Sequence, residues 1–230
     1  MPLRAIVFDF DGVIANSEPL HFRAYASVLA REGVALTEQD YYARYLGFDD
    51  VGAFQAIVRE RGLSWSPAFV RTLVERKAIE LEELERHVSV LFPGAADAIR
   101  RAAASVPIAI ASGARADEIR RVVRREQLEE CFSVIVSAED TPFSKPAPEP
   151  YLHAVAQLRT RADAPSLAAA DCVAIEDSRW GLESARAAGL RTIAVTNTYN
   201  AAALVPHADL VISSLADFDL DVVAALCRED

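Results

Sequence analysis

Cysteine is scarce in this chain of 230 residues, and its few cysteines form no recognisable pattern. Cys131, Cys172 and Cys227 are odd in number, far apart and without a C-x-x-C pair. The sequence therefore predicts neither a disulfide framework nor a zinc site, and it favours a reducing, cytoplasmic environment. We interpret the three cysteines as packing residues.

Long apolar runs and dense clusters of positive charge are also missing. Asp9 interrupts the first apolar segment, and no run approaches the ~18 apolar residues that a membrane span requires. Lys and Arg total 24 against 34 Asp and Glu, which gives a formal charge of -10. Because this charge repels nucleic acid and anionic membranes, we expect a soluble, unsecreted protein that binds neither.

Short apolar, β-branched runs recur along the chain, and most are separated by amphipathic helical stretches. The predicted strands are Ala5–Phe8, Ile108–Ala111, Val134–Val136, Val173–Ile175, Thr192–Val195 and Leu210–Ile212. Alternation of this kind is typical of a parallel sheet that carries helices on both faces. The predicted fold class is therefore α/β, with a Rossmann-like parallel sheet as its core.

The first two predicted strands are separated by about a hundred residues, far more than one crossover helix needs. Helix start and stop signals divide this stretch: Ser17 and Pro19 to Gly33, Thr37 to Gly47, a segment that ends at Gly62, and a last one from Ser66-Pro67. They indicate roughly four helices and no strand. We therefore predict an all-helical subdomain of residues 16–88, inserted into an α/β core domain of residues 1–15 and 89–230.

Chemically reactive side chains follow four of the predicted strands. In chain order they are Asp9 and Asp11, Ser112-Gly113, Lys145, and Glu176-Asp177. Ligands of open parallel sheets bind at the carboxyl ends of the strands, where these residues are expected to meet. Two carboxylates beside a buried strand must be paired or desolvated, a cost that a hard cation and a phosphoryl group would offset. The set favours Mg²⁺-assisted phosphoryl transfer.

Four ordered motifs carry a resemblance to a known family. They are Asp9-Phe10-Asp11-Gly12-Val13-Ile14, Ile110-Ala111-Ser112-Gly113, Ser144-Lys145-Pro146-Ala147-Pro148-Glu149 and Ile175-Glu176-Asp177-Ser178. The chain resembles the haloacid dehalogenase (HAD) superfamily, in the subfamily with a helical cap inserted after the first strand. Within it, the chain is similar to β-phosphoglucomutase and the sugar-phosphate phosphatases, over nearly its whole length.

The resemblance implies a role for each core residue. Asp9 would be the nucleophile that forms an aspartyl-phosphate, and Asp11 would protonate the leaving oxygen and then activate water. Mg²⁺ would be held by the Asp9 side chain, the Asp11 backbone carbonyl and Asp177, with Glu176 either a further ligand or a neighbour of the ligands. Ser112, the Gly113 amide and Lys145 would hold the phosphate.

The resemblance also implies substrate contacts in the cap. His21 and Lys77 match a cap histidine and a substrate-facing cap lysine of the mutase group. A partly exposed helix histidine and a solvated lysine are the alternative interpretations. Arg115, in the loop after Ser112, could add positive charge beside the substrate.

The cap loop at Gly47 departs from the mutase pattern. Leu46 precedes this glycine and Phe48-Asp49-Asp50 follow it, where the mutases carry a lysine before and an arginine after. Acids at this place would repel the second phosphate that a mutase has to hold. The expected activity is therefore Mg²⁺-dependent hydrolysis of a small phosphorylated metabolite, such as a sugar or polyol phosphate.

Other functions remain open at this stage. Mutase-type transfer of phosphate between sugar positions is the first alternative. From a different class, a phospho-accepting receiver domain or a sugar-phosphate sensor without turnover would also combine acids, a hydroxyl and a lysine at strand ends. The sequence sets no oligomeric state, and a monomer or a homodimer is expected.

Overall fold

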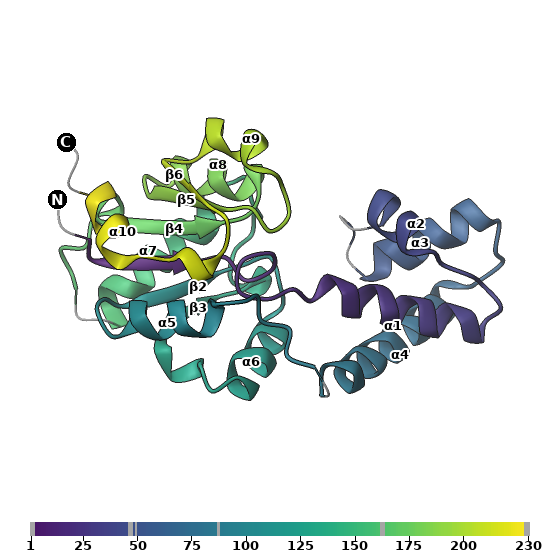
Figure 1. Cartoon of the computed structure of the whole chain (residues 1–230). Helices are drawn as coiled ribbons and strands as arrows, with labels where there is room; N and C mark the ends of the chain where they lie inside the picture. Colours follow the sequence, from purple (N-terminus) through teal and green to yellow (C-terminus); the bar gives the residue numbers. More distant parts are fainter. Residues whose placement is uncertain (1–2, 46–47, 49, 87, 162–163, 228–230) are drawn as a thin grey trace. The chain divides into compact units, whose positions relative to one another are not determined.

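The computed structural model describes residues 3–45, 48, 50–86, 88–161 and 164–227 (Figure 1). Two compact units divide the chain. Met1–Asn16 together with Val90–Asp230 form the first, here called the α/β unit, and Ser17–Ser89 form the second, here called the helical unit.

A six-stranded parallel sheet is the centre of the α/β unit, which confirms the predicted fold class. Its strands are β1 (Ala5–Phe8), β2 (Ile108–Ala111), β3 (Phe132–Val136), β4 (Cys172–Glu176), β5 (Arg191–Val195) and β6 (Leu210–Ile212). The spatial order is β3-β2-β1-β4-β5-β6, so β1 is hydrogen-bonded on both sides. Phe8, its last residue, lies opposite Ile110 of β2 and Ile175 of β4. The residue that follows β1 therefore lies near the middle of the edge formed by the carboxyl ends of the strands.

Helices cover both faces of this sheet (Figure 1). They are α5 (Ala95–Ala103), α6 (Ala116–Arg125), α7 (Glu149–Arg161), α8 (Arg179–Ala187), α9 (Ala201–Leu204) and α10 (Leu220–Leu226). On one face, Val7, Ala109 and Ala174 of the strands pack with Tyr151 and Leu158 of α7 in a buried cluster. Small strand residues let α7 approach the sheet closely, which brings the Tyr151 side chain beneath the strand ends.

Four helices make up the described part of the helical unit: α1 (Glu18–Arg31), α2 (Glu38–Arg44), α3 (Asp50–Arg61) and α4 (Pro67–Glu85). Two of the predicted caps are confirmed, because Thr37 accepts a hydrogen bond from the Asp40 amide and Ser66 accepts one from the Phe69 amide. Ser17 also precedes its helix, α1, but its side chain makes no capping hydrogen bond there. Phe54 and Leu73 belong to a buried cluster that all four helices share. This unit therefore has its own apolar core.

The α/β unit also contains the two segments that lead to and from the helical unit. Ala15 and Leu91 form an antiparallel bridge, and the Asn16 amide donates to the Val90 carbonyl at 2.6 Å.

Cys172 and Cys227 are buried and Cys131 is half-buried, all three as free thiols. No described helix combines the length and apolar character that a membrane crossing needs.

Candidate functional site

Asp9 occupies the turn that follows β1, at the carboxyl edge of the sheet. Its amide continues the sheet by donating to the Ile175 carbonyl at 2.9 Å, and the residue is only 8% exposed. Gly12, with φ +78°, then reverses the chain, and its amide donates to the Ala15 carbonyl at 2.9 Å. Asp11, half-buried, lies in this turn in a bridge with Ala15. The backbone thus fixes the first aspartate rigidly.

Lys145 joins the ends of three neighbouring strands. Its Nζ donates to Asp9 Oδ1 at 2.7 Å, to Glu176 Oε1 at 2.6 Å and to the Ala111 carbonyl at 2.9 Å. An ammonium group has three N–H donors, so each of them has a partner here. The sequence prediction that Lys145, Asp9 and Glu176 would meet at the strand ends agrees with these distances.

Asp9, Glu176 and Asp177 form a buried acidic cluster in the described part of the chain. Carboxylate oxygens of these three residues lie within 4.8 Å of one another. Three carboxylates against the single Lys145 ammonium leave a formal charge of about -2 where water is largely excluded. A divalent cation with a preference for oxygen ligands would balance this charge, and Mg²⁺ is such a cation.

The pKa values of these groups reflect their burial and the charges of their neighbours. Burial raises the pKa of Asp9 well above its usual range, although the Lys145 charge opposes this rise. Burial, and then the negative charge of Glu176, raise the pKa of Asp177 to about 6. Burial lowers the pKa of Lys145, but the charges of Asp9 and Glu176 and the hydrogen bonds to them together outweigh burial, and the pKa is raised overall. The lysine is therefore charged, and the acids hold excess negative charge that attracts cations.

Two glycines allow the carboxylates to pack this closely. A Cβ at Gly12 would lie 2.0 Å from Asp177 Oδ2, and one at Gly181 would lie 1.9 Å from the carboxyl carbon of Glu176. Neither carboxylate could keep its position beside a larger residue. The glycines at 12 and 181 are thus part of the site although neither carries a reactive group.

Replacement of Gly181 by Ala tests this packing. On helix propensity alone, Gly to Ala within α8 would stabilise the protein by up to ~1 kcal/mol. Because the new methyl group displaces the Glu176 carboxyl, we expect instead a loss of ~1–3 kcal/mol in the free energy of unfolding and a lower kcat. Urea unfolding and an assay of phosphate release measure both. A more stable, fully active variant would contradict the predicted clash.

Sequence reasoning missed three further side chains that support the cluster. The Tyr151 hydroxyl donates to Glu176 Oε1 at 2.7 Å, and Asn197 Nδ2 donates to the Gly12 carbonyl at 2.8 Å. A hydrogen bond from the Thr198 side chain lowers the pKa of Asp177 against the larger effect of burial. Asn197-Thr198 follow β5, so the strand-end rule could have found them. Tyr151 lies inside a helix and has no such signal.

The predicted phosphate-binding residues lie in the loop between β2 and α6. Ser112 is buried, and its Oγ accepts a hydrogen bond from the Ala114 amide at 3.0 Å. Gly113 is exposed, with open space where a Cβ would be. Arg115 precedes α6 and is 66% exposed; its Nε donates to Asp117 Oδ1 at 3.1 Å. Arg115 thus contacts acids at the surface, and its role toward substrate stays a prediction.

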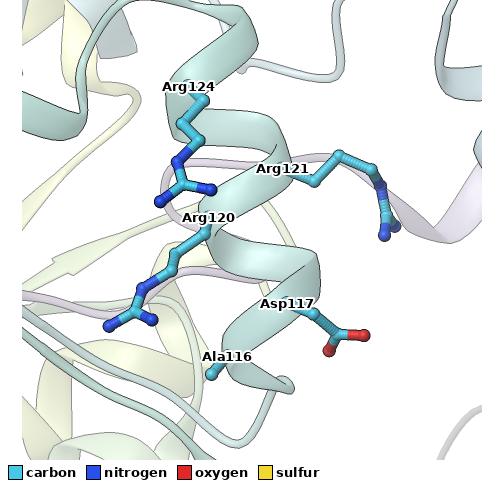
Figure 2. Close-up of a pocket in the computed structure, with 5 residues that line it drawn as sticks. All are labelled: Ala116, Asp117, Arg120, Arg121 and Arg124. Carbon is cyan, nitrogen blue, oxygen red and sulfur yellow. The ribbon is translucent and has the colours of Figure 1, made fainter.

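A shallow hollow of about 640 Å³ lies along α6. Its lining residues are Ala116, Asp117, Arg120, Arg121 and Arg124, none of which belongs to the acidic cluster. Figure 2 shows Arg120 and Arg124 on one side of the helix and Arg121 pointing to the other. Arg124 is also paired with Glu129 at 2.6 Å. The arginines do not converge on one point, so we do not place the reaction here.

In the helical unit, the predicted substrate residues His21 and Lys77 contact each other. Lys77 Nζ lies 2.9 Å from His21 Nδ1 and donates to Asp50 Oδ1 at 2.7 Å, and its side chain is only 1% exposed. The interpretation of Lys77 as a solvated surface lysine is therefore wrong, because its charge is buried and paired. Gly47 lies outside the described residues.

Asp50 differs from the expectation that it would act as an unbalanced acid. It accepts hydrogen bonds from Lys77 and from the Tyr25 hydroxyl, the latter at 2.6 Å. Since Lys77 balances its charge, Asp50 by itself gives little repulsion of a second phosphate. The charge argument against a mutase then depends on Asp49, which lies outside the described residues.

Replacement of Asp50 by Asn would remove the carboxylate that contacts the buried Lys77 ammonium directly. We expect a loss of ~3 kcal/mol in the stability of the helical unit, measured by urea unfolding. Asp40→Asn is the matched control: its side chain is 29% exposed against 30% for Asp50, but its partner Arg44 is 56% exposed. The control should lose less than ~1 kcal/mol. Equal losses in both variants would contradict the buried pair.

The same pair predicts a pH dependence. Burial raises the pKa of Asp50, but the charge of Lys77 and the hydrogen bonds from Lys77 and Tyr25 together outweigh burial and hold the pKa below the ordinary value of 3.8. The pair therefore contributes its full stabilisation above pH 3.8 and loses it as the pH falls through the lowered value. Wild-type stability should fall in this acid range more steeply than that of Asp50→Asn. If the stabilities of the wild type and of Asp50→Asn fell in parallel with pH, the ion pair would not contribute this stabilisation.

The protein has only two lysines, and both occupy the same kind of site. Lys145 Nζ lies 5.0 Å from the centre of the Tyr151 ring, and Lys77 Nζ lies 5.0 Å from that of Tyr25. Each ammonium also pairs with an aspartate at 2.7 Å. All other basic side-chain charge comes from arginine and histidine. Each lysine thus has internal partners.

The sequence of this chain is similar to those of known proteins. Residues 6–195 match the family described as haloacid dehalogenase-like hydrolase. Protein CbbY of Rhodobacter capsulatus is 34% identical over 209 residues, which cover 86% of this chain and 88% of CbbY. Hexitol phosphatase B of Escherichia coli K12 is 30% identical over 193 residues, which cover 83% of this chain and 82% of that protein.

Solved structures agree with these sequence matches. The crystal structure of a putative β-phosphoglucomutase from Thermotoga maritima superposes with a TM-score of 0.79 at 26% identity, over 96% of this chain and 98% of that one. CbbY from Rhodobacter sphaeroides, in complex with phosphate, gives a TM-score of 0.77 at 26% identity, over 94% and 96% of the two chains. The chain therefore belongs to the haloacid dehalogenase-like hydrolase family.

Proposed function

We propose that this protein is a Mg²⁺-dependent phosphatase that hydrolyses a small phosphorylated metabolite through an aspartyl-phosphate at Asp9. The observation that carries the proposal is the Lys145 ammonium, 2.7 Å from Asp9 Oδ1, beside a cluster of three carboxylates. A nucleophilic carboxylate can approach an anionic phosphate only where positive charge neutralises both of them. This site supplies one cation of its own and has acids to hold another.

The proposed reaction has two steps. An oxygen of Asp9 forms a bond to phosphorus while the ester P–O bond breaks, and Asp11 donates a proton to the leaving alcohol oxygen. Asp11 then takes a proton from water, whose oxygen attacks phosphorus and displaces the Asp9 carboxylate. Inorganic phosphate leaves, and both aspartates return to their starting states. Lys145, Ser112 and the Gly113 amide would hold the phosphate oxygens in both steps.

The acidic cluster fits Mg²⁺ by its donor type and its charge. All candidate ligands are oxygens, and the excess negative charge is the amount that a divalent cation would balance. Asp9, the Asp11 carbonyl and Asp177 would hold the ion, with Glu176 beside them. When bound, Mg²⁺ withdraws negative charge from the phosphate oxygens.

The names of the relatives narrow the substrate class. They include a hexitol phosphatase, 30% identical, and a phosphorylated carbohydrates phosphatase of Thermotoga maritima, 28% identical. A CbbY variant from Rhodobacter sphaeroides was solved with xylulose-(1,5)bisphosphate bound, at 26% identity to this chain. We propose a sugar or polyol phosphate as substrate, and we assign substrate closure to residues 16–88, acting as a cap.

Mutase-type transfer is the second candidate, because the structural relatives include a putative β-phosphoglucomutase. We further propose that the enzyme acts in the cytoplasm, since its three cysteines are free thiols, and that it is a monomer or a homodimer. The proposed phosphatase and the mutase share the transfer of the phosphoryl group to Asp9. They differ in whether water or a second sugar hydroxyl receives the phosphoryl group.

A substrate panel tests the proposal. The purified protein with Mg²⁺ is assayed for released phosphate on hexitol phosphates, hexose phosphates and xylulose 1,5-bisphosphate, with para-nitrophenyl phosphate as a general substrate. We expect release from at least one sugar or polyol phosphate. Conversion of β-glucose 1-phosphate to glucose 6-phosphate without free phosphate would show a mutase. Tight binding of a sugar phosphate without turnover would show a sensor.

A further inference from the structure

Glu176 accepts hydrogen bonds on both of its carboxylate oxygens. Its Oε1 accepts hydrogen bonds from Lys145 at 2.6 Å and from the Tyr151 hydroxyl at 2.7 Å. Its Oε2 accepts from the Asp177 amide at 3.2 Å and from Ser178 Oγ at 3.3 Å. With four donors, both oxygens are satisfied, and the residue is 0% exposed. Glu176 is therefore a fixed anchor point.

Tyr151 contacts this anchor and the lysine at once. It is fully buried on α7, where packing among apolar side chains sets its ring position. The hydroxyl bonds to Glu176, while the ring centre lies 5.0 Å from Lys145 Nζ. A cation at this distance from an aromatic ring is attracted to its face. One side chain thus restrains both partners of the Lys145–Glu176 ion pair.

From this geometry we propose that Tyr151 is a positioning residue for phosphoryl transfer, which holds Lys145 against Asp9 by fixing Glu176. The inference rests on the proposed phosphatase function. Without the Tyr151 hydroxyl, Glu176 Oε1 would keep only the lysine as donor, and the ion pair could swing away from Asp9. Lys145 would then lose the orientation in which its third N–H donor reaches the Asp9 carboxylate.

The opposite side of Glu176 is closed as well. Gly181 leaves no room for a Cβ beside the carboxyl, and its amide donates to Ser178 Oγ at 3.1 Å. Ser178 Oγ in turn lies 3.3 Å from Glu176 Oε2. Glu176 is thus held between α7, through Tyr151, and the start of α8, through Ser178 and Gly181. Removal of the Tyr151 hydroxyl therefore removes the contact from α7 and leaves those from the start of α8 in place.

The two-lysine composition provides a direct probe. With ¹⁵N-labelled lysine, the side-chain ammonium NMR spectrum contains the signals of Lys77 and Lys145 alone, and Lys77→Arg assigns them. In Tyr151→Phe we expect the Lys145 signal to shift and its exchange with water to accelerate, while the Lys77 signal stays in place. Tyr25→Phe is the matched control, because Tyr25 contacts Lys77 in the same way. It should move only the Lys77 signal.

Kinetics complete the test. We expect Tyr151→Phe to lower kcat by ~10–100-fold with KM changed less than about twofold, the size of effect typical of residues that orient a catalytic group. In a Glu176→Gln background the same substitution should have almost no further effect, since the anchor is already weakened. An unmoved Lys145 signal with wild-type kcat, or equal losses of kcat in both backgrounds, would overturn the proposal.

A folding defect of the variant, or a failure of the phosphatase proposal, can be distinguished from a failure of the positioning proposal. If Tyr151→Phe fails to fold, as judged by circular dichroism, Glu176→Gln alone must displace the Lys145 signal, and an unmoved signal overturns the proposal. If the wild-type protein releases no phosphate from any substrate, the phosphatase proposal fails. The positioning proposal is then decided by the Lys145 signal, which requires no substrate.

Discussion

Asp9→Asn is expected to reduce the rate of phosphate release by at least about a thousandfold, because an amide is a far weaker nucleophile than a carboxylate. The fold should tolerate the change. Asn keeps an oxygen that can accept the hydrogen bond from Lys145, and the substitution removes one of three crowded carboxylates. We expect the free energy of unfolding to change by less than about 1 kcal/mol. Steady-state kinetics and urea unfolding measure the two effects.

The control for this variant is Asp97→Asn. Asp97 is an exposed carboxylate in the first turn of α5, and it is not one of the three clustered carboxylates. It should keep wild-type kcat. Retention of more than a few per cent of activity in Asp9→Asn would remove this residue from the role of nucleophile.

Removal of Mg²⁺ is the second change with a large expected effect. After treatment with EDTA and dialysis, turnover should fall to the assay background, because the remaining excess negative charge repels an anionic substrate. Addition of Mg²⁺ should restore full activity. Undiminished turnover in the presence of EDTA would contradict a metal-dependent reaction.

The same metal should stabilise the fold. A ligand that binds only the folded state, at a concentration of 100 times its Kd, adds ~2.7 kcal/mol to the free energy of unfolding. Thermal unfolding with and without Mg²⁺ measures this gain. Asp177→Asn, which removes one of the clustered carboxylates, should weaken it. A gain that is equal in wild type and variant would show that Mg²⁺ binds elsewhere.

The central strands of the sheet could be predicted from sequence because they are buried on both faces. β1 and β2 consist entirely of buried residues, so they read as unbroken apolar runs. β3 begins two residues before the predicted Val134, because the polar Ser133 interrupts the apolar pattern while Phe132 already pairs with Ile108. Backbone pairing, which the side-chain pattern does not report, extends this strand.

The convergence of Asp9, Lys145 and the 176–177 pair followed from the rule that parallel strands end at one edge. Their support could not be predicted in the same way. Tyr151 and Gly181 act through packing of helices against a strand end, and neither residue type signals chemistry in the sequence. The pair of the buried Lys77 with the half-buried Asp50 joins residues 27 positions apart, beyond the reach of local helix patterns.

The central claim is that Asp9 itself becomes phosphorylated. The most direct measurement mixes the enzyme, Mg²⁺ and a turned-over substrate, quenches the reaction with acid within milliseconds, and maps phosphorylated peptides by mass spectrometry. The account predicts a phosphoryl group on Asp9 that disappears as substrate is exhausted and that is absent from Asp9→Asn. Phosphate release with no adduct at Asp9, or with an adduct on another residue, would contradict it.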